Sequence, residues 1–307
     1  MRDLPTELWL QILSSACLDD GSTARALSVV SHQIRAISHQ FRYQSIAVIG
    51  SRQAQHLVDA LQHPDHLGCR VEALFVEADD SNLIAQLCSI VAPTVEILTI
   101  VATAPPPSIL DLPNTSPLDF DCPRLRELTV RGFSMLPRSS TFAPILERLE
   151  ITYSIACLNT PFFESSAFNH PNLLYTLLHY HLNRQAIGAF SSMLQIIGVV
   201  GLSVYNRQNK SASSPQRGVA IEFVPTAVQP KDGIETREMH RAQWMLQNRL
   251  KSNSHFVLLP ERARSDGIAH ERWLDRVQGK RGVWAFIEAK IKENIRQAND
   301  EAGSLNT

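Results

Sequence analysis

Histidines are the first residues in this 307-residue sequence whose spacing could support metal chemistry. His179 and His181 flank Tyr180, so both imidazoles would point the same way on a strand, and His170 precedes them. No carboxylate or cysteine stands at ligand spacing around these histidines. We therefore interpret them as ordinary strand or loop residues and predict no metal site.

Acidic pairs and known catalytic motifs give no stronger sign of an enzyme. Asp79–Asp80 and Asp119 with Asp121 are interpreted as loop carboxylates, and Lys280–Arg281 as a solvated turn. The sequence contains no G-x-G-x-x-G, G-x-x-x-x-G-K-S/T, G-x-S-x-G or H-E-x-x-H pattern. We predict a non-enzyme without a cofactor. An enzyme with an unrecognised site remains the alternative, and it would need a deep pocket lined by perturbed titratable groups.

Composition narrows the class of protein further. The chain is 44% apolar and 19% charged, and its formal net charge of −1 gives no electrostatic footprint for nucleic acid. No secretory signal peptide is evident. Five cysteines, an odd number without a C-x-x-C pair, favour free thiols in a reducing compartment. We expect a cytoplasmic or nuclear location, or both. The cysteines are Cys17, Cys69, Cys88, Cys122 and Cys157.

One uncharged segment, 185–206, is long enough to cross a bilayer, which takes about 20 residues. Polar residues dilute its hydrophobicity, and no second such segment exists. We predict a buried helix leading into a buried strand, with no membrane partner. A membrane segment is the alternative.

A degenerate hexad of the form aliphatic-x-x-Leu-x-Val/Ile recurs through the middle of the chain. In each hexad the Leu and the aliphatic residue two places on share one face of a strand. Such short strands cannot enclose a core alone, so neighbouring repeats must stack. The hexads are 71–76, 95–100, 125–130, 146–151 and 199–204, with a weaker one at 173–178.

These hexads resemble leucine-rich repeats, which form a curved solenoid with parallel strands on its concave side. The spacing is irregular, so we predict a short, irregular α/β solenoid of this kind; a general α/β sheet is the alternative. The residue between each Leu and its partner would line the concave face and bind a protein substrate of unknown identity. These candidate substrate-binding residues are Phe75, Thr99, Thr129, Glu150 and Ser203.

Apolar residues at helical spacing fill the first 43 residues. Leu4–Pro5 begins a helix in which Leu8 and Ile12 share a face, and a second apolar set runs from Ala26 to Phe41. A helical unit this small cannot bury so much apolar surface by itself. We therefore expect a partner, or the rest of the chain, to cover part of it.

This segment resembles an F-box, the helical module that docks a substrate receptor onto the Skp1 adaptor of cullin-based ubiquitin ligases. Its ending, Phe41-Arg42-Tyr43, is closer to fungal F-box-like proteins, which the run Trp273-Leu274-Asp275-Arg276 also resembles. The resemblance implies a substrate-recognition adaptor that binds a Skp1-like protein and, through it, a cullin. A non-ligase interaction scaffold is the alternative. The implied adaptor-binding residues are Leu4, Pro5, Glu7, Leu8, Ile12, Leu13, Leu27, Val30, Ile34 and Phe41.

The remaining segments complete the predicted organisation. We expect helices at 51–62, 81–91 and 235–250, and a final helix at about 283–299 that covers the last strand as a cap. Further strands are expected at 219–224 and 255–259, and a proline-rich loop at 104–123. The predicted parts are a helical module at 1–48, a solenoid at 49–206, a flexible loop at 207–218, and C-terminal strands with capping helices at 219–307.

Overall fold

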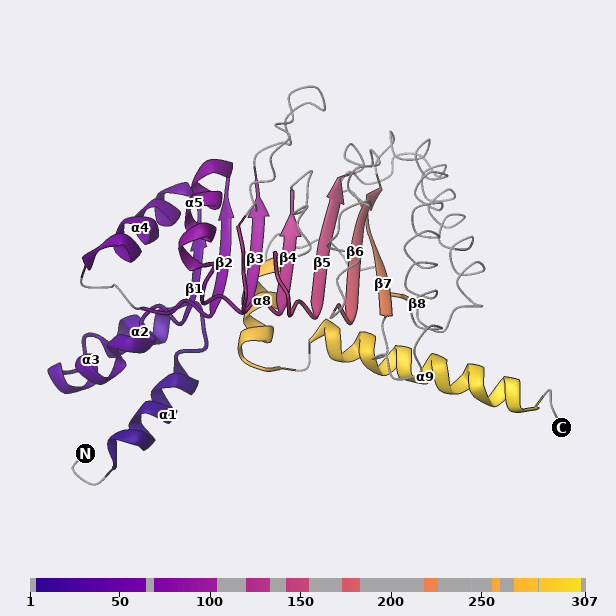
Figure 1. Ribbon diagram of the computed structural model, residues 1–307, viewed down its shortest axis with the longest axis horizontal. Helices are drawn as coiled ribbons and strands as arrows, with labels where there is room; N and C mark the ends of the chain where they lie inside the picture. The colour runs from indigo at the N-terminus through magenta and orange to yellow at the C-terminus, as the bar shows by residue number, and fades with distance from the viewer. Residues whose placement is uncertain are drawn as a thin grey trace.

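A computed structural model of the chain shows an α/β protein in which N-terminal helices adjoin a parallel β-sheet (Figure 1). The structure describes residues 4–64, 69–103, 120–132, 142–154, 173–182, 218–225, 244, 256–259, 268–280 and 282–304.

Three short helices and a 3₁₀ turn form the N-terminal unit, as the apolar spacing predicts. They are α1 (Thr6–Ala16), α2 (Ser22–Leu27), α3 (His32–Ser38) and the 3₁₀ helix η1 (His39–Phe41). In Figure 1, α1 and α3 extend away from the sheet.

Eight parallel strands follow one another in the sheet in the order of the sequence. They are β1 (Ser45–Ile49), β2 (Ala73–Ala78), β3 (Ile97–Ala102), β4 (Glu127–Arg131), β5 (Arg148–Ser154), β6 (Tyr175–Leu182), β7 (Gly218–Pro225) and β8 (Phe256–Leu258). Each of the strands β2 to β6 overlaps one predicted hexad and begins two residues after the start of that hexad. Strands β7 and β8 overlap the two further predicted strands. The sequence analysis assigned no strand to the residues of β1.

The register of the sheet aligns the leucines of successive hexads. Leu74, Leu98, Leu128 and Leu149 are direct neighbours across β2 to β5. All four are buried, and each shares its face with the aliphatic residue two places on. The predicted adjacency of these leucines in parallel strands is therefore confirmed, while Leu202 lies outside the described residues.

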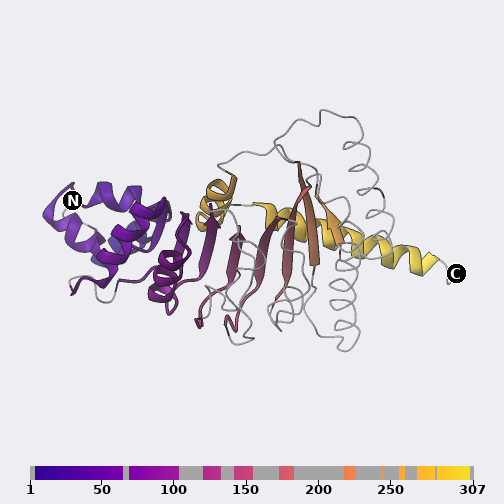
Figure 2. The same ribbon diagram turned by 90° about the horizontal axis from the view of Figure 1, so that it is seen from above.

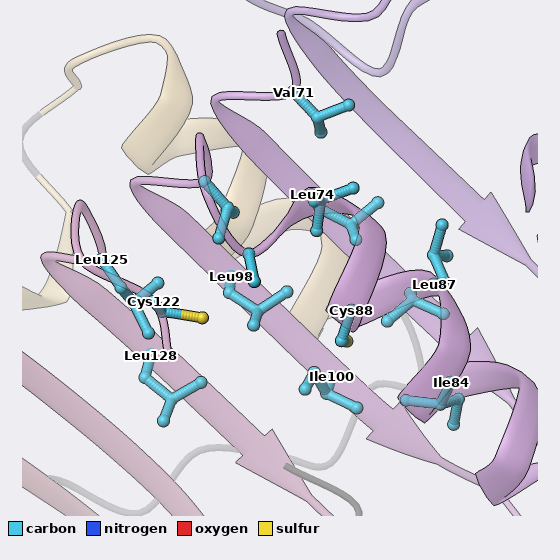
Figure 3. Close-up of a cluster of buried hydrophobic side chains, with 14 of the residues drawn as sticks. Val71, Leu74, Ile84, Leu87, Cys88, Leu98, Ile100, Cys122, Leu125 and Leu128 are labelled. Atoms are coloured by element: carbon cyan, nitrogen blue, oxygen red, sulfur yellow. The ribbon is translucent and has the colours of Figure 1, made fainter. Parts of the chain in front are cut away.

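Helices α4 (Ser51–Gln62) and α5 (Ser81–Val91) cover this leucine face and match the predicted helices. Asp80 caps α5, since its carboxylate accepts hydrogen bonds from the backbone N–H of Asn82 and Leu83 at 2.9 and 3.1 Å. Figure 3 shows Ile84 and Cys88 of α5 beside Leu98 and Ile100 of β3, in a continuous apolar core.

Helices α8 (Ile268–Val277) and α9 (Val283–Ser304) lie on the opposite face of the sheet (Figure 2). The final helix contacts the last strand, as predicted, but it approaches from the face of the sheet and also covers β7. Ile287 and Ile291 pack on Tyr175, Ala220 and Val257.

Gly218, at the start of β7, allows the close approach of α9. A Cβ atom at this position would lie 1.9 Å from Cδ1 of Ile291, far closer than such atoms approach in proteins. A larger residue would therefore force the Ile291 side chain of α9 to move.

Several predictions fall on residues outside the described part of the chain. These are Ser203, the segment 185–206, the loop 207–217, and nearly all of the segments 104–123 and 235–250. Within the described part, no helix is long and apolar enough to cross a membrane.

Candidate functional site

A carboxylate holds the turn between α1 and α2 of the N-terminal unit. Asp19 accepts hydrogen bonds from the backbone N–H of Gly21 and Thr23 and from the Ser22 hydroxyl, at 2.8, 2.9 and 2.9 Å. Burial alone would raise the pKa of Asp19, but hydrogen bonds from Thr23, Ser22 and Gly21 outweigh burial and hold it below the ordinary value. The ionised carboxylate thereby satisfies N–H groups at the start of α2.

Hydrogen bonds also tie this unit to the first strand of the sheet. The Ser45 hydroxyl donates to the backbone carbonyl of Asp19, and the Ala47 N–H donates to that of Asp20 at 3.3 Å. Gly21 takes a positive φ of 90° above this strand, where an added Cβ would lie 3.1 Å from the Ile46 side chain. The helices therefore stand in a fixed position at the β1 edge of the sheet.

The N-terminal unit leaves a set of large apolar side chains exposed to solvent. Leu8 and Ile12, one turn apart on α1, are 43% and 50% exposed, and Leu4 precedes them by one turn. Val29 and Val30, in the turn before α3, are 75% and 59% exposed. We call these five residues the N-terminal apolar surface. Large apolar side chains that a small unit leaves exposed to solvent are candidates for an interaction site.

The ten residues that the F-box resemblance implies for adaptor binding divide by exposure. Leu4, Pro5, Glu7, Leu8, Ile12 and Val30 are exposed, and Leu27 and Phe41 are half-buried. Leu13 and Ile34 are buried within the described fold, so they support the unit from inside. Val29 belongs to the exposed set, although the implied list does not contain it.

The candidate substrate-binding residues occupy the sheet face opposite the leucines. Phe75, Thr99, Thr129 and Glu150 are direct neighbours across β2 to β5, and we call them the central row. Alternation along each strand places them there, as the sequence predicts. All four are nevertheless buried, at 0–1% exposure. The prediction of a face open to a partner does not match this structure, because α8 covers it.

Helix α8 contacts the central row through an aromatic side chain and two arginines. Trp273 is fully buried, and its ring centroid lies 5.9 Å from that of Phe75. Arg276 hydrogen-bonds to the Glu150 carboxylate and, at 2.5 Å, to the Thr129 hydroxyl. Arg272 lies 3.3 Å from the same carboxylate.

Glu150 is the centre of the polar contacts beneath α8. Its carboxylate also accepts from Arg131 at 3.3 Å, and the Thr129 hydroxyl lies 3.4 Å away. A second carboxylate, Glu127, pairs with Arg148 of β5 and lies 3.9 Å from Nε of Arg276. Three arginines therefore converge on one buried carboxylate.

Burial and the Glu150 carboxylate act in opposite directions on the pKa of Arg131. Burial lowers the pKa of this guanidinium, while the neighbouring Glu150 carboxylate acts in the opposite direction. The positive charges of Arg272 and Arg276 lower it further. The arginines thus compete for the same carboxylate.

Sequence reasoning did not assign a role on the sheet to Arg272, Trp273 or Arg276. A signal was present, because two arginines four residues apart lie on one side of a helix, and the central row contains a single acidic residue. An aromatic residue beside the first arginine likewise matches Phe75 in that row.

The histidines and aspartates considered as possible metal ligands or catalytic groups lie in separate parts of the chain. His179 and His181 belong to β6, and His170 and Asp119 lie outside the described residues. Asp79 accepts a hydrogen bond from the Ser51 hydroxyl. Among the described residues, no cluster of three or more His, Cys, Asp or Glu could hold a metal ion.

Comparison with protein-family models and with curated proteins identified no relative. No protein-family model matches this chain, and no curated protein was found to be similar to it. The functional argument therefore depends on the residues and their geometry.

Proposed function

We propose that this protein is a substrate receptor of a Skp1–cullin–F-box type ubiquitin ligase. Its N-terminal helical unit would dock on a Skp1-like adaptor, and its repeat region would hold a protein substrate. The observation that carries the proposal is the N-terminal apolar surface, exposed on a unit that hydrogen bonds fix to the sheet.

The exposure pattern favours docking over a purely internal role for these helices. A helical cap on the following domain would bury Leu8, Ile12 and Val30, whereas a docking module would leave them open. All three are at least 43% exposed, while Leu13 of the same helix is buried. Covering a leucine-sized side chain contributes about 1.5–3 kcal/mol, so a partner would gain substantially from this surface.

The sheet supports the receptor half of the proposal. Parallel strands in sequence order, with aligned leucines on one face and helices between the first strands, suit a leucine-rich-repeat-like solenoid. Such a receptor needs no catalytic side chain. It acts by raising the effective concentration of a bound substrate near the ubiquitin-charged enzyme.

Adaptor capture by purified protein tests the docking half. The double variant Leu8→Asp with Ile12→Asp should abolish co-purification with a Skp1-like adaptor, because an unpaired buried carboxylate costs several kcal/mol. Gln33→Asp with Ala36→Asp is the matched control, since it adds two charges at exposed positions of α3 outside the apolar surface.

The control should still capture the adaptor, and all variants should keep the circular dichroism spectrum of the wild type. Adaptor capture by the Leu8→Asp, Ile12→Asp variant would refute the docking proposal. Absence of capture by the wild-type chain would favour an interaction scaffold without a ligase link.

A further inference from the structure

The two faces of the sheet differ in chemistry, although both are covered. The face toward α4 and α5 is a continuous apolar core that includes Leu98, Leu128 and Leu149. The face toward α8 buries Thr99, Thr129 and Glu150 in the same three strands. Burial of polar groups is unfavourable unless hydrogen bonds replace those lost to water. A face made of such residues can be exposed to water at lower cost than the leucine face.

The contact under α8 leaves polar atoms without hydrogen-bond partners. They include the Thr99 hydroxyl, Oε2 of Glu127, Nε of Arg276 and the indole N–H of Trp273. Water would hydrogen-bond to these groups if α8 moved away. In the closed contact the Thr99 hydroxyl and the Trp273 indole N–H have no hydrogen bond, and Oε2 of Glu127 and Nε of Arg276 face each other at 3.9 Å, too far apart for one.

The fully buried apolar part of the contact is smaller than the leucine core on the other face. It consists of Ala73, Phe75, Ala269, Trp273 and Val277, against which the partly buried Leu18, Ala47, Ile97, Val101 and Leu274 pack.

What α8 presents to the sheet is a defined chemical pattern. Arg272 and Arg276 lie one turn apart and reach the same buried carboxylate of Glu150, and Trp273 occupies the position over Phe75. A guanidinium can donate two hydrogen bonds to one carboxylate, which makes the contact selective for geometry. The contact between two aromatic rings adds to this selectivity. A helix of another protein with the same pattern would find the same partners.

We propose that the central row is a protein-recognition site whose intramolecular occupant is α8, displaced by a partner helix with two arginines four residues apart and an aromatic residue beside the first. Such a partner would be the substrate class of the proposed ubiquitin-ligase receptor. Only the ubiquitination of the bound partner rests on that proposed function. Competition with α8 lowers the apparent affinity of the partner by the fraction of molecules in which the face is open.

The test uses the full-length chain and a fluorescein-labelled peptide with the sequence of residues 268–280. Fluorescence anisotropy should detect weak binding to the wild type and at least tenfold tighter binding to the Arg276→Ala chain, in which α8 is held less firmly. Glu271→Ala, on the exposed side of α8, is the matched control and should bind as the wild type does. A peptide with Ala at positions 272 and 276 should not bind.

Equal peptide affinity for the wild-type and Arg276→Ala chains would overturn the inference, as would equal binding of the alanine-substituted peptide. Hydrogen exchange of the wild-type chain gives a measurement that needs no variant. Amides of α8 should exchange through a local opening at least tenfold faster than those of β2 to β5. Equal protection of α8 and these strands would overturn the proposal. Neither measurement involves the adaptor, so failure here leaves adaptor docking untouched.

Discussion

Glu150→Gln should weaken the closed contact between α8 and the sheet strongly. Glu150 is fully buried and accepts hydrogen bonds from Arg131, Arg272, Arg276 and Thr129. Removal of one partner from a buried ion pair typically costs about 3–5 kcal/mol, because the remaining charges stay desolvated. Here three guanidiniums lose their common carboxylate, so we expect a loss within that range.

Urea unfolding followed by tryptophan emission measures this loss, since Trp273 and Trp284 are both buried beside the contact. With a slope of about 3 kcal/mol/M, the midpoint should fall by about 1–2 M. If α8 separates before the sheet unfolds, the loss appears instead as an early transition in the tryptophan signal.

Glu147→Gln is the matched control, because the same substitution three residues earlier affects a surface pair. Glu147 lies 3.5 Å from Arg126 with both side chains partly exposed, and such pairs contribute at most about 1 kcal/mol. If the unfolding curves of Glu150→Gln and Glu147→Gln coincided, the reasoning about the buried carboxylate would be refuted.

Three further outcomes follow from the described contacts. Leu128→Ala should lower the free energy of unfolding by about 2–5 kcal/mol in urea titrations, because it leaves a cavity in the fully buried leucine face; a loss below 1 kcal/mol would contradict this. Asp19→Asn should cost about 1 kcal/mol at neutral pH. The folded-state pKa of Asp19 is lowered, so its contribution is present above its ordinary pKa of about 4 and is lost as pH falls through the folded-state value. Thermal melts of variant and wild type should therefore converge below pH 4, and a constant difference would argue against this role. Burial raises the pKa of Cys122 to about 12 and also raises that of Cys88. Neither thiol should therefore react with iodoacetamide at pH 8 until urea unfolds the chain. Alkylation of either cysteine in the native protein, detected by mass spectrometry, would contradict this prediction.

Local patterns in the sequence were sufficient for much of the fold. The predicted helices at 51–62 and 81–91 coincide with α4 and α5, because an apolar stripe at helical spacing needs only nearby residues to be recognised. The hexads likewise placed Leu74, Leu98 and Leu128 in neighbouring strands.

What covers the other face could not be read in the same way. Thr99, Thr129 and Glu150 have the polarity of a solvent-facing row, and period-two alternation does not distinguish solvent from a polar helix packed on top. The decisive contact joins Thr129 to Arg276, 147 residues apart in the sequence. Pairing at that separation depends on tertiary structure, which local propensity does not encode.

The N-terminal apolar surface shows an intermediate case. Helical spacing predicted which residues of α1 share a face, but spacing alone did not separate exposed Ile12 from buried Leu13. That difference depends on how α1 packs in the folded unit, where it contacts α3.

The position of α8 and α9 has a consequence for biosynthesis. Strands β2 to β5 are complete once residue 154 has been made, whereas α8 and α9, which cover the opposite face, extend to Ser304. At about 5–20 residues per second, the ribosome needs on the order of 10–30 s to supply them. During that interval Phe75 and Glu150 lack the contacts that α8 makes with them in the folded protein. The nascent sheet should therefore engage chaperones until the last helices emerge, and truncations that remove them should reduce the yield of soluble protein.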